Sequence, residues 1–187
     1  VAVAHNGNIT NAGELRRQLE KDGSIFQASS DTEVILHLVA RSRETTLQGA
    51  LRDALLQLEG AFSLVFLAQD RVIVARDPHG FRPLAMGQLV QSNGRIAHAF
   101  ASETCAFDLI DAVYVNDVEP GEMICAGPEG VTRERYAPES NRAQCVFEHV
   151  YFSRPDSIVF GRAVLESREK LGARLAAQRR HAVFYRR

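Results

Sequence analysis

The stretch His5-Asn6-Gly7-Asn8 decides how the rest of this sequence is interpreted. It follows a short apolar run over residues 1–4, typical of a strand, and it precedes a helix that is expected from Asn11. Gly7 can adopt backbone conformations closed to other residues, and the Asn6 side-chain amide can donate two hydrogen bonds. An amide N–H beside a bare glycine N–H, on a tight turn at a strand end, suits an oxyanion hole. Taken alone, the dipeptide favours an ordinary turn.

Three helices are expected in the first sixty residues. Asn11 and Glu14 match a capping box, which predicts a helix over about 11–20. Ser30 and Glu33 repeat that pattern before a second apolar face. Asp31 then lies in the first turn of this second helix, where the helix dipole favours a carboxylate. A third helix is expected over about 47–58.

The pattern changes to strands after Gly60, with a short helix at 104–110. The expected strands are 61–68, 71–76, 84–90, 95–101, 112–116 and 122–126. Helices followed by antiparallel strands indicate an α+β fold. Residues 139–142 form a polar linker in this interpretation, residues 145–152 a further strand, and residues 163–179 a helix with Val164, Leu171 and Leu175 inward.

Composition excludes several classes of function. The 187 residues are 45% hydrophobic, enough for one sizeable domain with a core. The net charge of −1 gives no electrostatic case for a nucleic acid or an anionic membrane as partner. No apolar run approaches the ~20 residues that span a bilayer. Three scattered cysteines, at positions 105, 125 and 145, do not form a disulfide framework, so a reducing, cytoplasmic setting is expected.

Several longer motifs together resemble one family. HNGNITNAGELRRQL (5–19), SSDTEVI (29–35), GAFSLVFL (60–67), ARDPHGFRPLAMG (75–87) and ASETCAFDLI (101–110) are similar to the glutaminase domain of class II glutamine amidotransferases, which are N-terminal-nucleophile hydrolases. The resemblance implies a four-layer αββα sandwich with two mainly antiparallel sheets. It covers the chain to about Ala177, and residues 179–187 do not look like the end of a domain. We therefore expect a fragment that lacks both ends.

The resemblance also implies roles for particular residues. Asn6 and Gly7 match the oxyanion-hole pair of the family, and Gly7 also lines the glutamine pocket. Asp31 matches the aspartate that binds the α-ammonium group of glutamine, a role compatible with its place in a first helical turn. The nucleophile of the family is an N-terminal cysteine, whose α-amino group, with a pKa of ~8, acts as the base. We expect that cysteine upstream of Val1, so the fragment itself is expected to be inactive.

Two later motifs indicate the acceptor of the ammonia. DVEPGEM (117–123) and CVFEHVYFSRPDS (145–157) resemble the branch that transfers ammonia to phosphoribosylpyrophosphate. That reaction gives 5-phosphoribosylamine in the first step of de novo purine biosynthesis, and it uses magnesium in a phosphoribosyltransferase domain. Residues 1–138 would then be the glutaminase domain, and residues 139–187 a connecting segment and the start of the second domain. Family members form homo-oligomers.

Alternative interpretations remain open at this point. The glutaminase could serve another acceptor, as in glucosamine-6-phosphate or asparagine synthesis, or the chain could be a non-catalytic glutamine-binding remnant. Cys145 matches, in one branch of the family, the first of four thiolate ligands of an iron–sulfur cluster, but it is equally compatible with a small buried hydrophobe in a strand. Arg76 and Asp77 are expected to pair across a turn, as scaffold. Ser102 or Thr104 is expected to cap the short helix, and residues 151–157 to lie at the join between the domains.

Overall fold

A computed structural model describes residues 1–138 and 140–179, and this part of the chain contains two larger antiparallel sheets and one two-stranded antiparallel pair near its C-terminal end. The larger sheet has the order β1-β2-β3-β7-β8. Its strands are β1 (Ala2–Ile9), β2 (Gly60–Leu67), β3 (Val72–Arg76), β7 (Glu122–Gly127) and β8 (Gly130–Arg135). The smaller sheet has the order β5-β4-β6, from β4 (Ala85–Val90), β5 (Ile96–Ala101) and β6 (Val113–Asp117).

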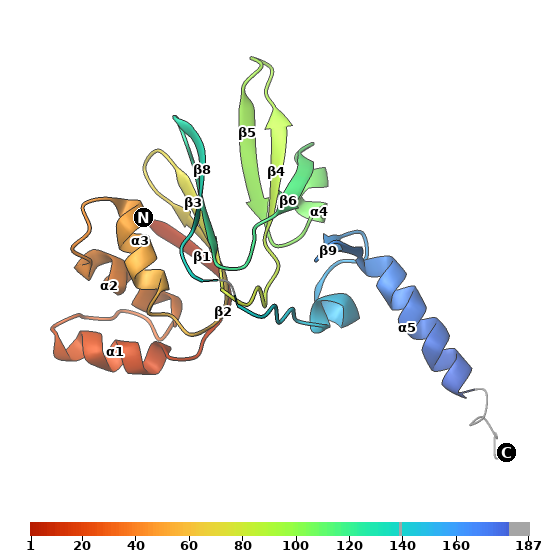
Figure 1. Cartoon of the computed structure of the whole chain (residues 1–187), viewed down its shortest axis with the longest axis horizontal. Helices are drawn as coiled ribbons and strands as arrows, with labels where there is room; N and C mark the ends of the chain where they lie inside the picture. Colours follow the sequence, from red (N-terminus) through yellow and green to blue (C-terminus); the bar gives the residue numbers. More distant parts are fainter. Residues whose placement is uncertain (139, 180–187) are drawn as a thin grey trace.

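Helices lie outside both sheets (Figure 1). Three helices cover one face of the larger sheet: α1 (Ala12–Lys21), α2 (Thr32–Arg41) and α3 (Leu47–Leu55). The short helix α4 (Cys105–Asp108) packs on the smaller sheet through the buried Phe107. The layers are therefore α, β, β and α, as expected, with one outer layer reduced to a single turn of helix.

Two of the cores lie on the two faces of the larger sheet. Between the three helices and the larger sheet, Ile35, Leu51 and Phe62 are completely buried. Val74 and Ile124 come from the other face of that sheet and pack against Leu84 and Met86 beside the smaller sheet. Because successive residues of a strand point to opposite faces, one sheet supplies both cores.

The C-terminal part of the described chain follows β8. A π-helical turn, η1 (Glu148–Phe152), is followed by the two short strands β9 (Ile158–Val159) and β10 (Arg162–Ala163) and by the helix α5 (Val164–Arg179). In Figure 1, α5 extends away from the layered body. Residues 180–187, whose unusual sequence was noted above, lie outside the described residues.

Several sequence-based predictions were wrong. Asn6 and Gly7 lie within β1 and not on a turn, because β1 pairs with β2 along its whole length. The region predicted as a strand at 145–152 contains η1 instead, and β8 was not predicted. Leu171 and Leu175 are not inward but half exposed, although Val164 is buried. The first part of the polar stretch 139–142 is not described, but Ser140 and Arg142 contact Pro78 and Glu119, so this part of the chain lies against the body.

Neither capping box formed as predicted. The Asn11 side chain instead accepts from the Glu59 N–H at 3.0 Å and donates to the Gln57 carbonyl at 2.8 Å, which ties the start of α1 to the α3–β2 connection. The Glu33 carboxylate accepts the N–H groups of Gln27 and Ala28. These two backbone hydrogen bonds hold the pKa of Glu33 below its usual value.

Candidate functional site: the edge of β1

The residues predicted to bind glutamine lie on or beside β1, which is the edge strand of the larger sheet in the described chain. Side chains alternate along a strand, so neighbouring residues face different layers. His5 points toward α2, where its Nδ1 lies 3.1 Å from the Thr32 hydroxyl. Asn6 points the other way, toward the smaller sheet. The side chains of His5 and Asn6 therefore lie on opposite sides of β1.

The Asn6 carboxamide is held at both ends. Its Nδ2 donates to the Ser102 hydroxyl at 2.9 Å, and its Oδ1 accepts from Arg82 Nε at 3.1 Å. Ser102 follows β5, and Arg82 lies in the β3–β4 connection. One N–H of Nδ2 is used by Ser102, which leaves the second available to a ligand because an amide nitrogen carries two.

Gly7 lies where the backbones of β1 and β2 approach closely. Its φ is +151°, and a Cβ built there would lie 2.0 Å from the Ala61 carbonyl oxygen. No side chain fits in that space, so glycine is required for the pairing of β1 with β2.

Asp31 precedes α2 and binds back to β1. One carboxylate oxygen accepts the Ile9 N–H at 2.9 Å, and the other accepts the Thr32 hydroxyl at 3.2 Å and lies 3.6 Å from His5 Nδ1. The side chain is 27% exposed. A carboxylate has about four acceptor positions, so Asp31 both anchors the helix to the strand and keeps capacity for another donor.

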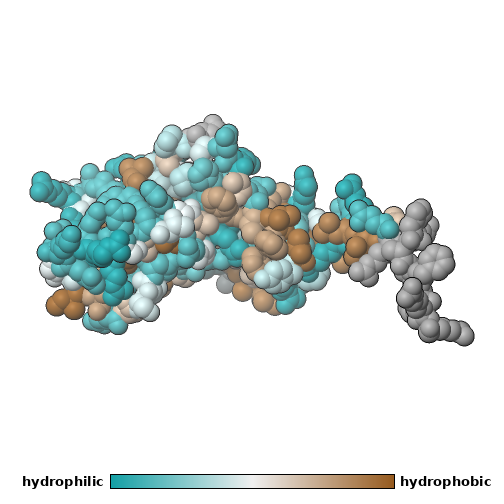
Figure 2. Space-filling model, turned by 90° about the horizontal axis from the view of Figure 1, so that it is seen from below, coloured by the Kyte–Doolittle hydropathy of each residue, from teal (hydrophilic) through white to brown (hydrophobic). Residues whose placement is uncertain are grey.

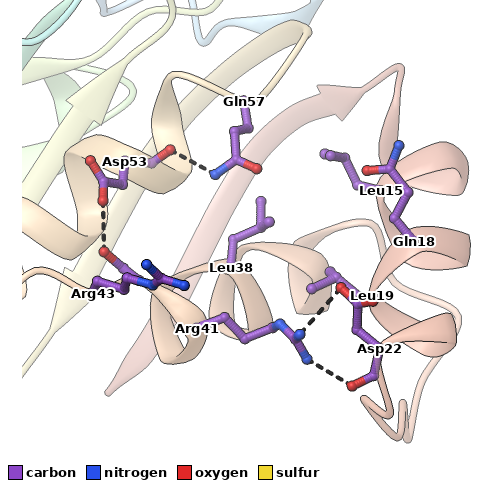
Figure 3. A pocket seen from close by; sticks show the side chains of 10 residues that line it. Leu15, Gln18, Leu19, Asp22, Leu38, Arg41, Arg43, Asp53 and Gln57 are labelled. Atoms are coloured by element: carbon purple, nitrogen blue, oxygen red, sulfur yellow. Dashed lines mark hydrogen bonds and ion pairs between the residues drawn. The ribbon is translucent and has the colours of Figure 1, made fainter.

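These contacts place Asn6 and Asp31 on opposite sides of the same short stretch of β1, with Gly7 between them in sequence. Five cavities of the described chain have linings that include none of these three residues. One of them, of about 370 Å³, lies among α1, α2 and α3 (Figure 3). Within it, Arg41 pairs with Asp22, and Asp53 accepts a hydrogen bond from the Ser42 hydroxyl. We therefore treat the edge of β1 as the candidate site.

The turn after β3 is scaffold, but not through the predicted ion pair. Arg76 donates to the carbonyls of Arg82, Val118 and Gly80, and no ion pair with Asp77 occurs in the described residues. The buried Asp77 accepts N–H groups of Phe62, His79 and Phe81. Burial raises the pKa of Asp77 and lowers that of Arg76. Both side chains thus satisfy backbone groups that position Arg82.

The segment Ser102-Glu103-Thr104 does not cap α4 with its side chains. Ser102 binds Asn6, and Thr104 accepts the Ile158 N–H at 2.8 Å. Glu103 accepts the Arg154 N–H and the Ser157 hydroxyl. This segment therefore connects the candidate site with residues 154–158.

Cys145 has a free, partly buried thiol, and its backbone N–H donates to the Phe81 carbonyl at 3.1 Å. Within residues 1–138 and 140–179, no group of three or more His, Cys, Asp or Glu side chains could hold a metal ion. The described residues therefore do not fit an iron–sulfur cluster, which takes four ligands. They do not fit a dedicated magnesium site either.

Sequence reasoning missed the residues that hold Asn6. Arg82 was noticed only as part of the ARDPHGFRPLAMG motif, and Glu148 was assigned to a strand. Arg82 Nη1 lies 2.9 Å from Glu148 Oε1, so both belong to the surroundings of Asn6. Nothing in the sequence singles out these two residues, because both motifs contain several other charged or polar residues.

Comparison with known proteins defines the class. Residues 1–108 match the profile of the glutamine amidotransferase domain, so the chain belongs to the glutamine amidotransferase domain family. Within that family it is similar to amidophosphoribosyltransferases. It is 51% identical to amidophosphoribosyltransferase 2, chloroplastic, of Arabidopsis thaliana over 95% of this chain and 31% of that protein. It is 46% identical to the Bacillus subtilis amidophosphoribosyltransferase over 95% of this chain and 36% of that protein.

A solved structure supports the same relationship. Glutamine phosphoribosylpyrophosphate amidotransferase from B. subtilis, complexed with ADP and GMP, superposes with a TM-score of 0.89 at 46% identity. The match covers 94% of this chain and 38% of the other. The chain thus spans about a third of the length of the curated relatives it matches. Among the described helices, none is long and apolar enough to cross a membrane.

Proposed function

We propose that this chain is the glutaminase part of an amidophosphoribosyltransferase. The whole protein would release ammonia from glutamine and transfer it to phosphoribosylpyrophosphate, giving 5-phosphoribosylamine. The observation that carries the proposal is the fixed carboxamide of Asn6 beside the side-chain-free Gly7, in a chain of this family.

The proposed chemistry assigns a separate task to each residue. A cysteine outside this chain would attack the amide carbon of glutamine. The free N–H of Asn6 Nδ2 and the backbone N–H of Gly7 would stabilise the oxyanion of the tetrahedral intermediate. The α-amino group of that cysteine would take the thiol proton and give it to the leaving nitrogen as the C–N bond breaks, so that ammonia leaves and a thioester forms. Water would then hydrolyse the thioester to glutamate and restore the thiol. Asp31 would bind the α-ammonium group through its remaining acceptor positions.

The remaining parts of the proposal concern the whole protein. Residues 1–138 would form the glutaminase domain, and residues 139–187 the connection to a phosphoribosyltransferase domain that uses magnesium. In this chain Cys145 would be an ordinary thiol, and a cluster in the whole protein would need three ligands from elsewhere. We propose a homo-oligomer in the cytoplasm, noting that the plant relatives are named chloroplastic.

Glutamine-dependent ammonia release by a full-length protein that contains this chain tests the proposal. Asn6→Ala should lower kcat about 10²- to 10³-fold with little change in KM, the effect of losing one oxyanion donor. Asn8→Ala is the matched control, because this exposed asparagine lies on the same strand two residues away. Asp31→Asn keeps an acceptor for the Ile9 N–H but should raise KM for glutamine about 10-fold or more, since a charged hydrogen bond is lost.

Product analysis separates the acceptors. Formation of phosphoribosylamine that depends on phosphoribosylpyrophosphate supports the proposed reaction, whereas transfer to a hexose phosphate or to aspartate assigns another acceptor. Unchanged ammonia release by Asn6→Ala, or no release from glutamine by the full-length protein, would overturn the proposal.

A further inference from the structure

We propose that Arg82 is a positioning residue for Asn6, and that the buried Glu148 of η1 locks Arg82 in place. This inference rests on the proposed function and deepens it. It assigns the orientation of the oxyanion-hole amide to an ion pair that reaches Asn6 from a segment about 140 residues further along the chain.

The first step concerns which end of the Asn6 carboxamide faces the substrate. A guanidinium group carries only donors, so the atom of Asn6 that faces Arg82 Nε at 3.1 Å must be the oxygen. The nitrogen is thereby turned toward Ser102 and the edge of β1. Ser102 alone cannot impose this choice, because a hydroxyl both donates and accepts. Without Arg82 the amide could flip and present its oxygen to a developing negative charge.

The second step concerns the strength of the donor. A cation at Oδ1 polarises the amide, and a hydrogen bond at one end of such a group strengthens the donor at the other. Arg82 is only 20% exposed, so water screens this effect little. Its charge therefore makes the Nδ2 N–H a better partner for an oxyanion.

The third step concerns what fixes Arg82. Its Nη1 lies 2.9 Å from Glu148 Oε1, and its guanidinium carbon lies 5.0 Å from the centre of the Phe152 ring. Glu148 is 3% exposed, and its other oxygen accepts the Ser153 hydroxyl at 2.7 Å. A buried carboxylate needs a charged partner, so Arg82 cannot leave without stranding Glu148. Every one of these contacts comes from η1 or the residue after it, and π-helical turns are frequent at functional sites.

The chain therefore links η1 to the oxyanion hole through two side chains. A shift of η1 would move Glu148, release Arg82 and loosen Asn6, although η1 itself contacts neither Asn6 nor Asp31 in the hydrogen bonds of the described residues. The position of η1 would thus set the rate of ammonia release without altering the groups that bind glutamine.

The test compares single and double variants in the full-length protein. Arg82→Met should lower kcat for ammonia release about 10-fold or more, with KM for glutamine within about twofold, because it removes a charged hydrogen bond that acts on the transition state. Glu148→Gln should have a smaller effect in the same direction. Arg82→Lys keeps one charged donor and should recover part of the rate. Arg52→Met removes an Arg–Glu pair on another face, with Glu134, and serves as the control.

Two readouts separate positioning from stability. Adding Arg82→Met to Asn6→Ala should cause no further loss of kcat, because Arg82 acts through Asn6. In this chain itself, labelled at asparagine nitrogen, the side-chain amide signal of Asn6 should shift in Arg82→Met and stay unchanged in Arg52→Met. Asn6→Ala identifies that signal.

The outcomes distinguish the two proposals. If Asn6→Ala is slow but Arg82→Met matches the parent in kcat, the positioning role is overturned and the proposed function stands. An unchanged Asn6 amide signal in Arg82→Met, or additive losses in the double variant, overturns it as well. If Asn6→Ala leaves ammonia release unchanged, the proposed function fails first, and the positioning role fails with it.

Discussion

The helices that cover the larger sheet and the C-terminal helix differ in how their apolar residues are arranged and in how far these residues are buried: α2 and α3 collect them on one face, whereas α5 has only a weak apolar face. On α2 and α3 the apolar face is buried: Ile35 and Leu51 are completely inaccessible. On α5, Leu171 and Leu175 fall on a predicted inward face, yet they are 51% and 53% exposed. A few leucines at helical spacing are therefore weak evidence of burial when the helix as a whole has no strong apolar face.

The difference also appears on the surface. Apolar residues gather over η1 and α5 (Figure 2). They include the exposed Val146, Phe147, Val150, Phe152, Leu165, Leu171 and Leu175. A groove of about 540 Å³ runs between these two elements and is lined by Val146 and Leu171, among others. Scattered apolar residues are normal on a surface, but here they are adjacent, so this end of the described chain is less completely packed than the other.

The comparison predicts a large difference between two core-type substitutions. Phe62→Ala removes a completely buried ring between the sheet and the helices and should lower the free energy of unfolding by about 3–5 kcal/mol. Leu171→Ala should cost about 0.5 kcal/mol or less, because that side chain is half exposed. Urea unfolding of both variants measures this. Similar losses in the two variants would mean that α5 is as well packed as the helical layer.

A second prediction concerns the close approach of β1 and β2. Gly7→Ala should lower the free energy of unfolding by about 1–3 kcal/mol, because its φ is +151° and its Cβ would meet the Ala61 carbonyl. Gly23→Ala is the control: that glycine also has a positive φ, but nothing lies within 4 Å of its Cβ position. The difference in thermal midpoint between the two variants isolates the contact with β2. Equal losses would contradict the close approach.

Much of the layered fold could be predicted from the sequence. The three helices between residues 12 and 55, and the change from helices to strands after them, follow from local periodicity and from glycine positions such as Gly60. The β8 strand could not be predicted in the same way, because its exposed, charged residues lack a clear apolar alternation. The segment 145–152 alternates like a strand, but the backbone forms η1, where the buried Glu148 binds Arg82. A tertiary contact overrode the local preference.

The candidate site could be predicted only in part. Asn6, Gly7 and Asp31 were found by resemblance to a family, and their catalytic roles remain predictions. That Asn6 and Asp31 face opposite sides of β1 depends on the alternation of an edge strand, which was obscured when residues 5–8 were interpreted as a turn. The partners Ser102 and Arg82 lie 96 and 76 residues from Asn6. Such pairings depend on the order of strands in the sheets, which a single sequence does not reveal.

A third prediction addresses how α5 is attached. Arg168 donates to the carbonyls of His149 and Ser153, at 2.9 and 2.6 Å, and so ties α5 to η1. Arg168→Ala should lower the free energy of local opening of α5 by about 1–2 kcal/mol, since charged hydrogen bonds are lost. Amide hydrogen exchange in α5 should become faster, while exchange in α2 should not change. Lys170→Ala, which removes an exposed pair with Glu166, is the control. Equal exchange in α5 of both variants would show that other contacts hold the helix.

The smallest expected effect lies at the rim of the smaller sheet. Burial raises the pKa of Asp117, although Tyr114 donates to its carboxylate at 3.1 Å and Arg76 lies nearby. The same surroundings raise the pKa of Tyr114 to about 12. Because the folded state holds the Asp117 proton more tightly than the unfolded chain does, this group lowers stability as the pH rises from about 4 through the raised pKa. Asp117→Asn cannot titrate, so the variant should lose less stability than the parent across that interval.

The sign of this effect follows from burial. An exposed, paired carboxylate such as Asp156, whose pKa is lowered by Arg154, would act in the opposite direction. Thermal midpoints of the parent and Asp117→Asn between pH 4 and 7 measure the difference in slope, and a parent that gains relative to the variant with rising pH would show that the ionised carboxylate is stabilised by its neighbours more than it is penalised by burial.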